Sequence, residues 1–231
     1  MINLKNKQDC CGCSACAQRC PKQCISMTED EEGFLYPQVD SSKCVDCHLC
    51  EKVCPVINQD EARTPLKVYA AKNSDDEIRL KSSSGGIFTL LAEQTIKDGG
   101  VVFGARYDTE WNVIHDYTET IEGLSAFRGS KYVQSNINRS FFKVKTFLES
   151  GRNVLFSGTP CQVAGLKLFL RKNYDNLLTL EIVCHGVPSR NVWRNYLKEL
   201  IDLKKISNIK SINFRDKKYG WNGYNFSITY H

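Results

Sequence analysis

The order of apolar and polar positions predicts regular structure over most of the chain. From Lys67 onward, short apolar runs typical of buried strands alternate with segments whose apolar residues recur at helical spacing. This alternation indicates an α/β or α+β domain. The strands are predicted at 67–72, 100–106, 112–118, 131–134, 153–157, 177–184, 208–214 and 223–230, and the helices at 75–81, 86–98, 120–126, 138–150, 160–172 and 190–204.

The first part of the chain has a different pattern. A polar turn at residues 30–33 lies between loosely alternating apolar positions, which predicts a hairpin within residues 25–43. Residues 58–66 are polar and have no periodic apolar face, so we interpret them as a linker. We therefore expect a small domain at 1–57 and a larger mixed domain at 67–231, which together give an α+β protein.

The C-terminal pattern predicts a strand that continues to the end of the sequence. Phe226, Ile228 and Tyr230 alternate with polar residues, and the chain stops at His231. We therefore expect the larger domain to be incomplete at its C-terminus. The alternative is a terminal strand that is paired within the sheet.

Composition places the chain among ordinary globular proteins. Hydrophobic residues make up 42% and charged residues 25% of the sequence, which argues against a wholly disordered chain. Apolar runs all fall short of the roughly 18 residues that a membrane span requires, so we expect none. The apolar segment of a secretory signal is also missing after Met1, so we expect a cytoplasmic protein.

Charge separates the two parts in the same way. Residues 1–60 carry 6 basic and 9 acidic side chains, a net charge of −3, whereas residues 61–231 carry 25 basic and 17 acidic side chains, a net charge of +8. A basic second part suits an anionic cofactor or partner. A basic surface that is merely solvated explains the charge equally well.

Cysteines are concentrated at the N-terminus, where they form a repeat. Ten of the 12 cysteines lie in the first 54 positions, and without a secretory signal such clustering favours metal ligands over disulfides. The spacing C-x2-C-x2-C-x3-C-P occurs twice, with an offset of 34 residues. The first copy holds Cys10, Cys13, Cys16 and Cys20, and the second holds Cys44, Cys47, Cys50 and Cys54.

This spacing predicts two [4Fe–4S] clusters. Three cysteines on one tight loop bind three corners of a cube, and the cysteine before the proline reaches the other cluster. Zinc sites have a different spacing, with paired cysteines or histidines separated by a longer spacer. Residues 1–57 thus resemble the dicluster ferredoxin family, and Cys11 and Cys24 are expected to pack beside the clusters. Cluster I is assigned to Cys10, Cys13, Cys16 and Cys54, and cluster II to Cys20, Cys44, Cys47 and Cys50.

Two turns of the larger domain combine glycine with a following helix. Residues 82–86 read Ser-Ser-Ser-Gly-Gly, and backbone N–H groups at such a helix start can bind phosphate. In the second turn, Thr159 is a suitable helix N-cap and Pro160 a suitable first residue, which places Cys161 in the first turn. The helix dipole there lowers the pKa of a thiol. Cys161 is a candidate reactive thiol, cluster ligand or flavin neighbour, or simply a small buried residue.

A third loop, Cys184–Ser189, follows an apolar strand. Because ligands gather at the carboxyl ends of strands in open α/β sheets, Cys161 and Cys184 could lie on one rim. Two thiols there could pair or supply half of a third cluster. The alternative is an exposed loop.

Five motifs in the larger domain carry a resemblance that extends over nearly the whole chain. They are SSGGIFT, RGSKYVQS, GTPCQVAGLK, CHGVPS and FRDKKYGW, in this order after the dicluster segment. Together they resemble the coenzyme F420 hydrogenase/dehydrogenase beta-subunit family. The resemblance implies a flavin-binding domain with FAD, whose contacts would be Ser83, Ser84, Gly85, Gly86, Ile87, Ser130, Lys131, Gly158, Thr159 and Cys161.

The same resemblance implies an oxidoreductase. A flavin exchanges two electrons as a hydride and releases them singly, so it stands between a hydride carrier and the clusters. We expect coenzyme F420 or another small molecule as the hydride donor or acceptor, a ferredoxin-like or other redox protein as partner, and no nucleic acid. The anaerobe's cytoplasm is the expected setting. The alternative is a non-catalytic subunit that carries two clusters and only transfers electrons.

Overall fold

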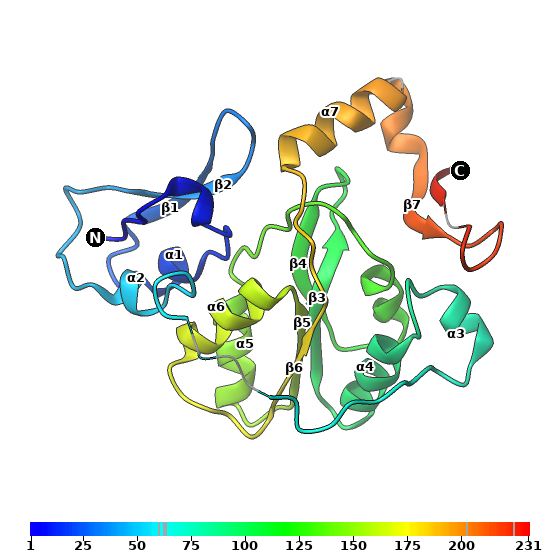
Figure 1. The fold of residues 1–231 in the computed structure, drawn as a ribbon, viewed down its shortest axis with the longest axis horizontal. Coiled ribbons are helices and arrows are strands. Elements are labelled where there is room, and N and C mark those ends of the chain that lie inside the picture. Colours follow the sequence, from blue (N-terminus) through cyan, green and yellow to red (C-terminus); the bar gives the residue numbers. More distant parts are fainter. Residues whose placement is uncertain (60, 62–63, 202, 224) are drawn as a thin grey trace.

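The structure is a computed structural model, and it describes residues 1–59, 61, 64–201, 203–223 and 225–231. We call residues 1–59 the N-terminal lobe and residues 64–231 the sheet lobe. In Figure 1 the N-terminal lobe lies beside the four-stranded sheet, on the side of that sheet covered by two helices.

The N-terminal lobe is built from a hairpin and short helices. Strand β1 (Ile25–Glu29) pairs antiparallel with β2 (Leu35–Val39), so the predicted hairpin is confirmed. The remaining elements are η1 (Lys7–Asp9), α1 (Ala15–Arg19) and α2 (Leu49–Lys52). The residues before α1 and α2, Ser14 and His48, are both left-handed, with φ of 61° and 56°. Each copy of the cysteine repeat thus has the same kind of backbone turn before its helix.

A mixed sheet forms the centre of the sheet lobe. Its strands are β3 (Val101–Tyr107), β4 (Val113–Thr118), β5 (Val154–Gly158) and β6 (Leu177–Glu181), arranged in the order β4-β3-β5-β6. Strand β4 runs antiparallel to β3, whereas β3, β5 and β6 are parallel. Parallel pairs need crossover connections, and helices α5 and α6 provide them.

Helices cover both faces of this sheet (Figure 1). Helix α4 (Ile87–Lys97) packs on one face through Ala92, against Val102 and Leu155. Helices α5 (Ser140–Glu149) and α6 (Pro160–Leu170) pack on the other, where Phe103 and Phe156 are fully buried. Successive strand residues point to opposite faces, so apolar runs buried on both sides are what this layering requires.

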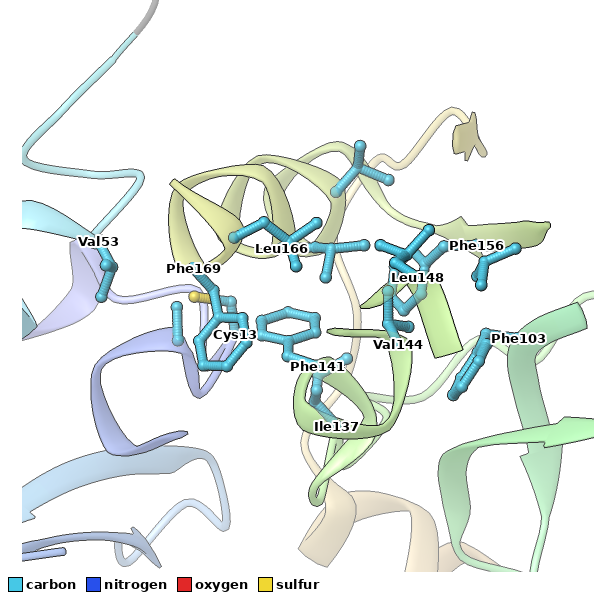
Figure 2. Packing of buried hydrophobic residues seen from close by; sticks show 14 of the residues in the cluster. Cys13, Val53, Phe103, Ile137, Phe141, Val144, Leu148, Phe156, Leu166 and Phe169 are labelled. Atoms are coloured by element: carbon cyan, nitrogen blue, oxygen red, sulfur yellow. The ribbon is translucent and has the colours of Figure 1, made fainter. Parts of the chain in front are cut away.

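The two lobes share one hydrophobic core (Figure 2). Cys13, Ala15 and Val53 of the N-terminal lobe pack in the same cluster as Phe141 of α5 and Phe169 of α6. Ala15 and Val53 have no exposed surface. Burial of a large apolar side chain contributes about 1.5–3 kcal/mol, so this shared core, which we call the seam, stabilises the contact between the lobes.

The C-terminal segment forms a second, smaller layer. Helix α7 (Arg190–Leu200) and η3 (Leu203–Asn208) lead into β7 (Ile209–Asp216), which pairs antiparallel with β8 (Asn225–Tyr230). The last strand thus joins a two-stranded sheet instead of the central one. Trp193, Phe214 and Phe226 pack between α7 and this sheet.

The predicted elements are found in the structure except at three places, although the strand predicted at 177–184 ends at Glu181 and the helix predicted at 190–204 ends at Leu200. Residues 67–72 form no strand, because the apolar Val68 and Tyr69 are exposed and bury nothing. Residues 131–134 also form no strand; Gln134 N instead donates to the carbonyl of Pro188. The predicted helix 120–126 is a 3-10 helix, η2 (Glu122–Phe127), and α3 (Asp76–Leu80) completes the described helices.

Some predicted positions lie outside the described residues. They are Asp60, Ala62 and Arg63 in the predicted linker, Asp202 in the predicted helix 190–204 and Tyr224 in the predicted strand 223–230. Among the described residues, no helix combines the length and the apolar character needed to cross a lipid bilayer.

Candidate redox site

One pocket of the N-terminal lobe gathers cysteines from both copies of the repeat. We call Cys20, Cys44, Cys47 and Cys50 the second cysteine set. All four line the same pocket. A fifth cysteine, Cys24, lines the same pocket, and its sulfur lies 3.3 Å from that of Cys20. The structure thus brings a thiol of the first copy to three of the second copy.

The first cysteine set, Cys10, Cys13, Cys16 and Cys54, lies nearer the sheet lobe. Burial, together with the neighbouring thiols of Cys10 and Cys54, raises the pKa of Cys16 to about 12. Cys13 packs directly beneath helix α6, where a Cβ atom added at Gly165 would lie 3.0 Å from the Cys13 sulfur. A side chain at position 165 would therefore require Cys13 to shift by a few tenths of an ångström.

The donors of both sets fit an iron–sulfur cluster. They are all thiols, which soft iron–sulfur centres prefer. A [4Fe–4S] cluster takes one thiolate for each iron, so its four sulfurs surround a cube. Among the described residues, no three Cys, His or carboxylate side chains meet at a single point, as they do around one ion. The raised pKa of Cys16 means that a bound cluster, whose iron stabilises thiolate, would release protons.

Cys161 contacts a cysteine next to the first set. It lies in the first turn of α6, which Thr159 and Gln162 start with a capping box. The Cys161 sulfur lies 3.1 Å from Thr159 Oγ1, and the Cys11 thiol is near enough to raise the pKa of Cys161. Cys11 in turn contacts Cys13. The turn between β5 and α6 therefore reaches the cysteines of the N-terminal lobe.

The expected low pKa of Cys161 is wrong. The neighbouring Cys11 thiol has the largest effect and burial adds to it, so the pKa of Cys161 is raised above the usual range. The Cys11 thiol beside Cys13 likewise has its pKa raised, to about 12.

Cys184 lies in a different environment. It is exposed, and its sulfur accepts a hydrogen bond from the backbone N–H of Gly186 at 3.4 Å. Cys161, by contrast, is half-buried against Cys11. Because β5 and β6 are neighbouring parallel strands, Cys161 and Cys184 both follow the same edge of the sheet, as expected. Among the described residues, however, no contact between the thiols of Cys161 and Cys184 occurs.

Two of the three predicted flavin-contact segments meet in the sheet lobe. The backbone N–H of Ser130 donates to Ser83 Oγ at 2.6 Å. Gly86, with φ of 78°, is the left-handed residue that starts α4. Lys131 is half-buried, and its ammonium donates to the carbonyls of Arg128 and Gly129 at 3.0 and 3.1 Å. Burial lowers the pKa of Lys131 to about 8.

A buried histidine, which the sequence pattern did not reveal, makes a hydrogen bond to the residue just before the third predicted flavin-contact segment, Gly158–Cys161. His115 Nε2 lies 3.1 Å from the carbonyl of Ser157, so this nitrogen donates. Nδ1 then accepts from the Ser135 hydroxyl at 3.0 Å, and Ser135 accepts from Gln162 Nε2 at 2.8 Å. Burial lowers the pKa of His115 to about 4, which keeps the ring neutral. The only signal in the sequence is a polar residue at an inward position of a strand.

Polar contacts also join the lobes. Gln18 Oε1 accepts from the backbone N–H of Phe141 at 3.2 Å, at the start of α5. At the hairpin, Arg194 of α7 donates to the carboxylate of Glu29 at 3.0 Å, and Arg190 pairs with the same carboxylate at 3.0 Å. This guanidinium contact lowers the pKa of Glu29. The N-terminal lobe is thus bound to the sheet lobe at two places, the start of α5 and helix α7.

Sequence comparisons match three family models to consecutive segments. The model described as 4Fe-4S dicluster domain matches residues 9–58. Two further models describe the Coenzyme F420 hydrogenase/dehydrogenase beta subunit. The model of its N-terminal part matches residues 68–141, and the model of its C-terminal part matches residues 151–230.

Curated relatives match the N-terminal region. A ferredoxin from Mycolicibacterium smegmatis is 35% identical over 74 residues, which are 31% of this chain and 65% of that protein. A 7Fe ferredoxin from Hydrogenibacillus schlegelii is 35% identical over 65 residues, which are 27% of this chain and 77% of that protein.

Among solved structures, a chain of the F420-reducing [NiFe] hydrogenase complex from Methanosarcina barkeri is similar with a TM-score of 0.48 and 20% identity. The similarity covers 69% of this chain and 55% of that chain. The chain thus spans about two thirds or less of the length of the Mycolicibacterium ferredoxin and of this hydrogenase chain.

Proposed function

The chain belongs to the coenzyme F420 hydrogenase/dehydrogenase beta-subunit family and begins with a 4Fe-4S dicluster domain, and from this premise we propose that it is an iron–sulfur flavoprotein oxidoreductase. It would move electrons between a hydride-carrying small molecule, coenzyme F420 or a similar compound, and a ferredoxin-like protein in the cytoplasm. Residues 1–57 would hold two [4Fe–4S] clusters, and residues 67–231 would hold FAD.

The contact between Cys161 and Cys11 carries this proposal. It places the β5–α6 turn, one of the proposed flavin segments, directly beside the cysteines of the first set. The shared core around Cys13 and Phe169 fixes this contact, because relative movement of the lobes would expose buried apolar surface. The lobes therefore keep a constant separation between the two proposed cofactor sites.

The second cysteine set, unlike the first, lies near the surface of the N-terminal lobe. Cys47 is exposed, and Val45 beside it has 57% of its surface exposed. The pocket of the second set thus opens near the surface of the N-terminal lobe. A protein partner can approach here, whereas the first set faces the sheet lobe. We propose that the first set serves the flavin side and the second set the partner side.

The proposed flavin site uses two features of the sheet lobe. The backbone N–H groups after Ser83 and the Lys131 ammonium would bind the anionic phosphates. A bound flavin would supply exchange of a hydride on one side and of single electrons on the other. The His115 network would hold the β5–α6 turn in place. Proposed contacts are Ser83, Ser84, Gly85, Gly86, Ile87, Ser130, Lys131, Gly158, Thr159 and Cys161.

The test is the cofactor content of anaerobically purified protein. We expect about one FAD per chain after acid extraction, and about eight irons with eight sulfides. Lys131→Gln should lower flavin content and leave iron unchanged. Lys97→Gln, at an exposed position in the last turn of α4, is the matched control and should change neither.

A second measurement tests electron flow. Reduced F420 or NADH, added to flavin-loaded protein, should reduce the clusters, as followed by electron paramagnetic resonance. Protein with eight irons but no flavin and no reduction by either donor contradicts the oxidoreductase. That result would instead indicate a subunit that only transfers electrons.

A further inference from the structure

The sequence motif FRDKKYGW, residues 214–221, covers the end of strand β7 and the loop that follows it. This loop begins with two lysines in different surroundings, because Lys217 is half-buried and Lys218 is exposed. The loop lies beside the segment that joins α3 to α4 (Figure 1). That segment contains the Ser-Ser-Ser-Gly-Gly turn, residues 82–86, which is the first of the proposed flavin segments.

The Lys217 ammonium binds the start of this turn. Its Nζ donates to the carbonyl of Arg79 at 3.2 Å and to the carbonyl of Ser82. The ring of Trp221 lies over the same ammonium, with 3.6 Å between Nζ and the ring centroid, a distance at which a cation is attracted to the aromatic face. A side chain 135 positions further along the chain therefore fixes the carbonyl at which the turn begins.

The other end of the turn is fixed by Asn73, which is 5% exposed. The backbone N–H of Asn73 donates to the Gly85 carbonyl at 2.7 Å, and its side-chain Nδ2 donates to the Gly86 carbonyl at 3.4 Å. Among the described residues, no acceptor is found for the backbone N–H groups of Ser84, Gly85 and Gly86. Carbonyls at both ends of the turn are thus bound by other segments, while consecutive N–H groups remain for an anion.

Positive charge is concentrated around the same turn. Burial, together with the charges of Arg215 and Arg79, lowers the pKa of Lys217. Arg79 also pairs with the carboxylate of Asp76 at 2.6 Å. Cations this close together repel one another, and an anion bound beside them relieves the repulsion. The surroundings of the turn therefore suit a phosphate group.

We propose that Lys217 is a positioning residue of the flavin site, which keeps the turn 82–86 in the conformation whose N–H groups bind a flavin phosphate. This inference rests on the proposed function, because it requires a phosphate-bearing flavin at this turn. Lys217 acts through the Ser82 carbonyl and needs no contact with the flavin itself. Because the turn offers N–H donors to an anion, loss of Lys217 should weaken binding of the phosphate and not of the flavin ring.

The experiment compares a flavin that has phosphate with one that lacks it. Cluster-loaded full chain is depleted of flavin and titrated with FAD or with riboflavin, which has no phosphate, and flavin fluorescence reports binding. Lys217→Gln should raise the dissociation constant for FAD about tenfold, as loss of one charged hydrogen bond allows, and leave that for riboflavin unchanged. Lys217→Arg should recover most of the FAD affinity. The matched control Lys218→Gln should change neither constant.

Each result has a defined meaning. Wild type that binds no FAD contradicts the proposed function itself. Wild type that binds FAD, with Lys217→Gln binding it equally tightly, contradicts only the positioning role. Equal losses for FAD and riboflavin, or equal losses in Lys217→Gln and Lys218→Gln, also contradict it, because they indicate a general effect of structure or charge. Where riboflavin does not bind wild type, the FAD constants of these two variants decide.

A second variant covers the case in which Lys217→Gln is poorly folded, as judged by its melting temperature without flavin. Trp221→Leu removes only the ring over the ammonium and leaves Lys217 in place. It should raise the dissociation constant for FAD a few-fold, because the ammonium is then less well held, and leave that for riboflavin unchanged. An FAD constant equal to that of wild type overturns the inference.

Discussion

Gln18 of the N-terminal lobe caps a helix of the sheet lobe, because its side-chain oxygen accepts a hydrogen bond from the backbone N–H of Phe141 at 3.2 Å. The same oxygen lies 3.4 Å from the N–H of Phe142. The residue at the N-cap of α5, Arg139, makes no side-chain capping bond. A residue 123 positions away in the sequence therefore does what a local N-cap does elsewhere.

Removal of this cap should loosen the contact between the lobes. We expect Gln18→Ala to lower the free energy of unfolding by about 1 kcal/mol, since a buried N–H of α5 loses its partner. Chemical denaturation of the cluster-loaded protein measures this. Gln8→Ala, at an exposed position of the same lobe, should have no effect. Equal stabilities of the two variants would contradict the cap.

Helix α6 and Cys13 should tolerate no added atoms between them. A Cβ at position 165 would lie 3.0 Å from the Cys13 sulfur and 3.2 Å from its Cβ. Overpacking of this kind destabilises by about 1–3 kcal/mol, whereas alanine in a helix gains up to about 1 kcal/mol over glycine. We expect Gly165→Ala to lower the melting temperature and Gly165→Val to lower it further. Lys167→Ala, at an exposed position of the same helix, is the control. A Gly165→Ala protein as stable as wild type would show that the packing between α6 and Cys13 accommodates an added methyl group.

His115 should make stability depend on pH. Its pKa is about 4 in the folded protein against an ordinary 6.5, so the unfolded chain binds more protons between these values. The stabilisation from the neutral ring is complete above pH 6.5 and is lost as pH falls toward 4, with a loss of about 1 kcal/mol from pH 6.5 to 5.5. His115→Gln should remove this part of the pH dependence, while His185→Gln, at an exposed position, should retain it. Denaturation curves at pH 7 and 5.5 measure the difference, and identical slopes for His115→Gln and wild type would contradict a neutral histidine.

Lys131 should make flavin affinity depend on pH. Burial lowers its pKa to about 8, so the ammonium loses its charge as pH rises through that value. The attraction for a phosphate is present below pH 8 and weakens above it. We expect the dissociation constant for FAD to rise between pH 7 and 9 in wild type and to stay constant in Lys131→Gln. Fluorescence titration of flavin-depleted protein measures both, and a flat wild-type profile would place the phosphates away from Lys131.

The sequence by itself determined most of the local structure and the dicluster character of the N-terminal segment. Strands such as 100–106 and helices such as 160–172 were predicted to within one or two residues, because their apolar periodicity repeats at short range. The repeated cysteine spacing of Cys10–Cys20 and Cys44–Cys54 is likewise recognisable within a short segment of sequence.

Only the tertiary structure decided which segments meet. Gln18 and Phe141, or Cys11 and Cys161, lie far apart in the chain, and nothing in their local patterns specifies that they touch. The position of Cys24 against Cys20 depends on a left-handed residue between them, and the raised pKa of Cys161 depends on a thiol from the other lobe. Periodicity reports which face of an element is buried, whereas long-range packing selects the partner that covers it.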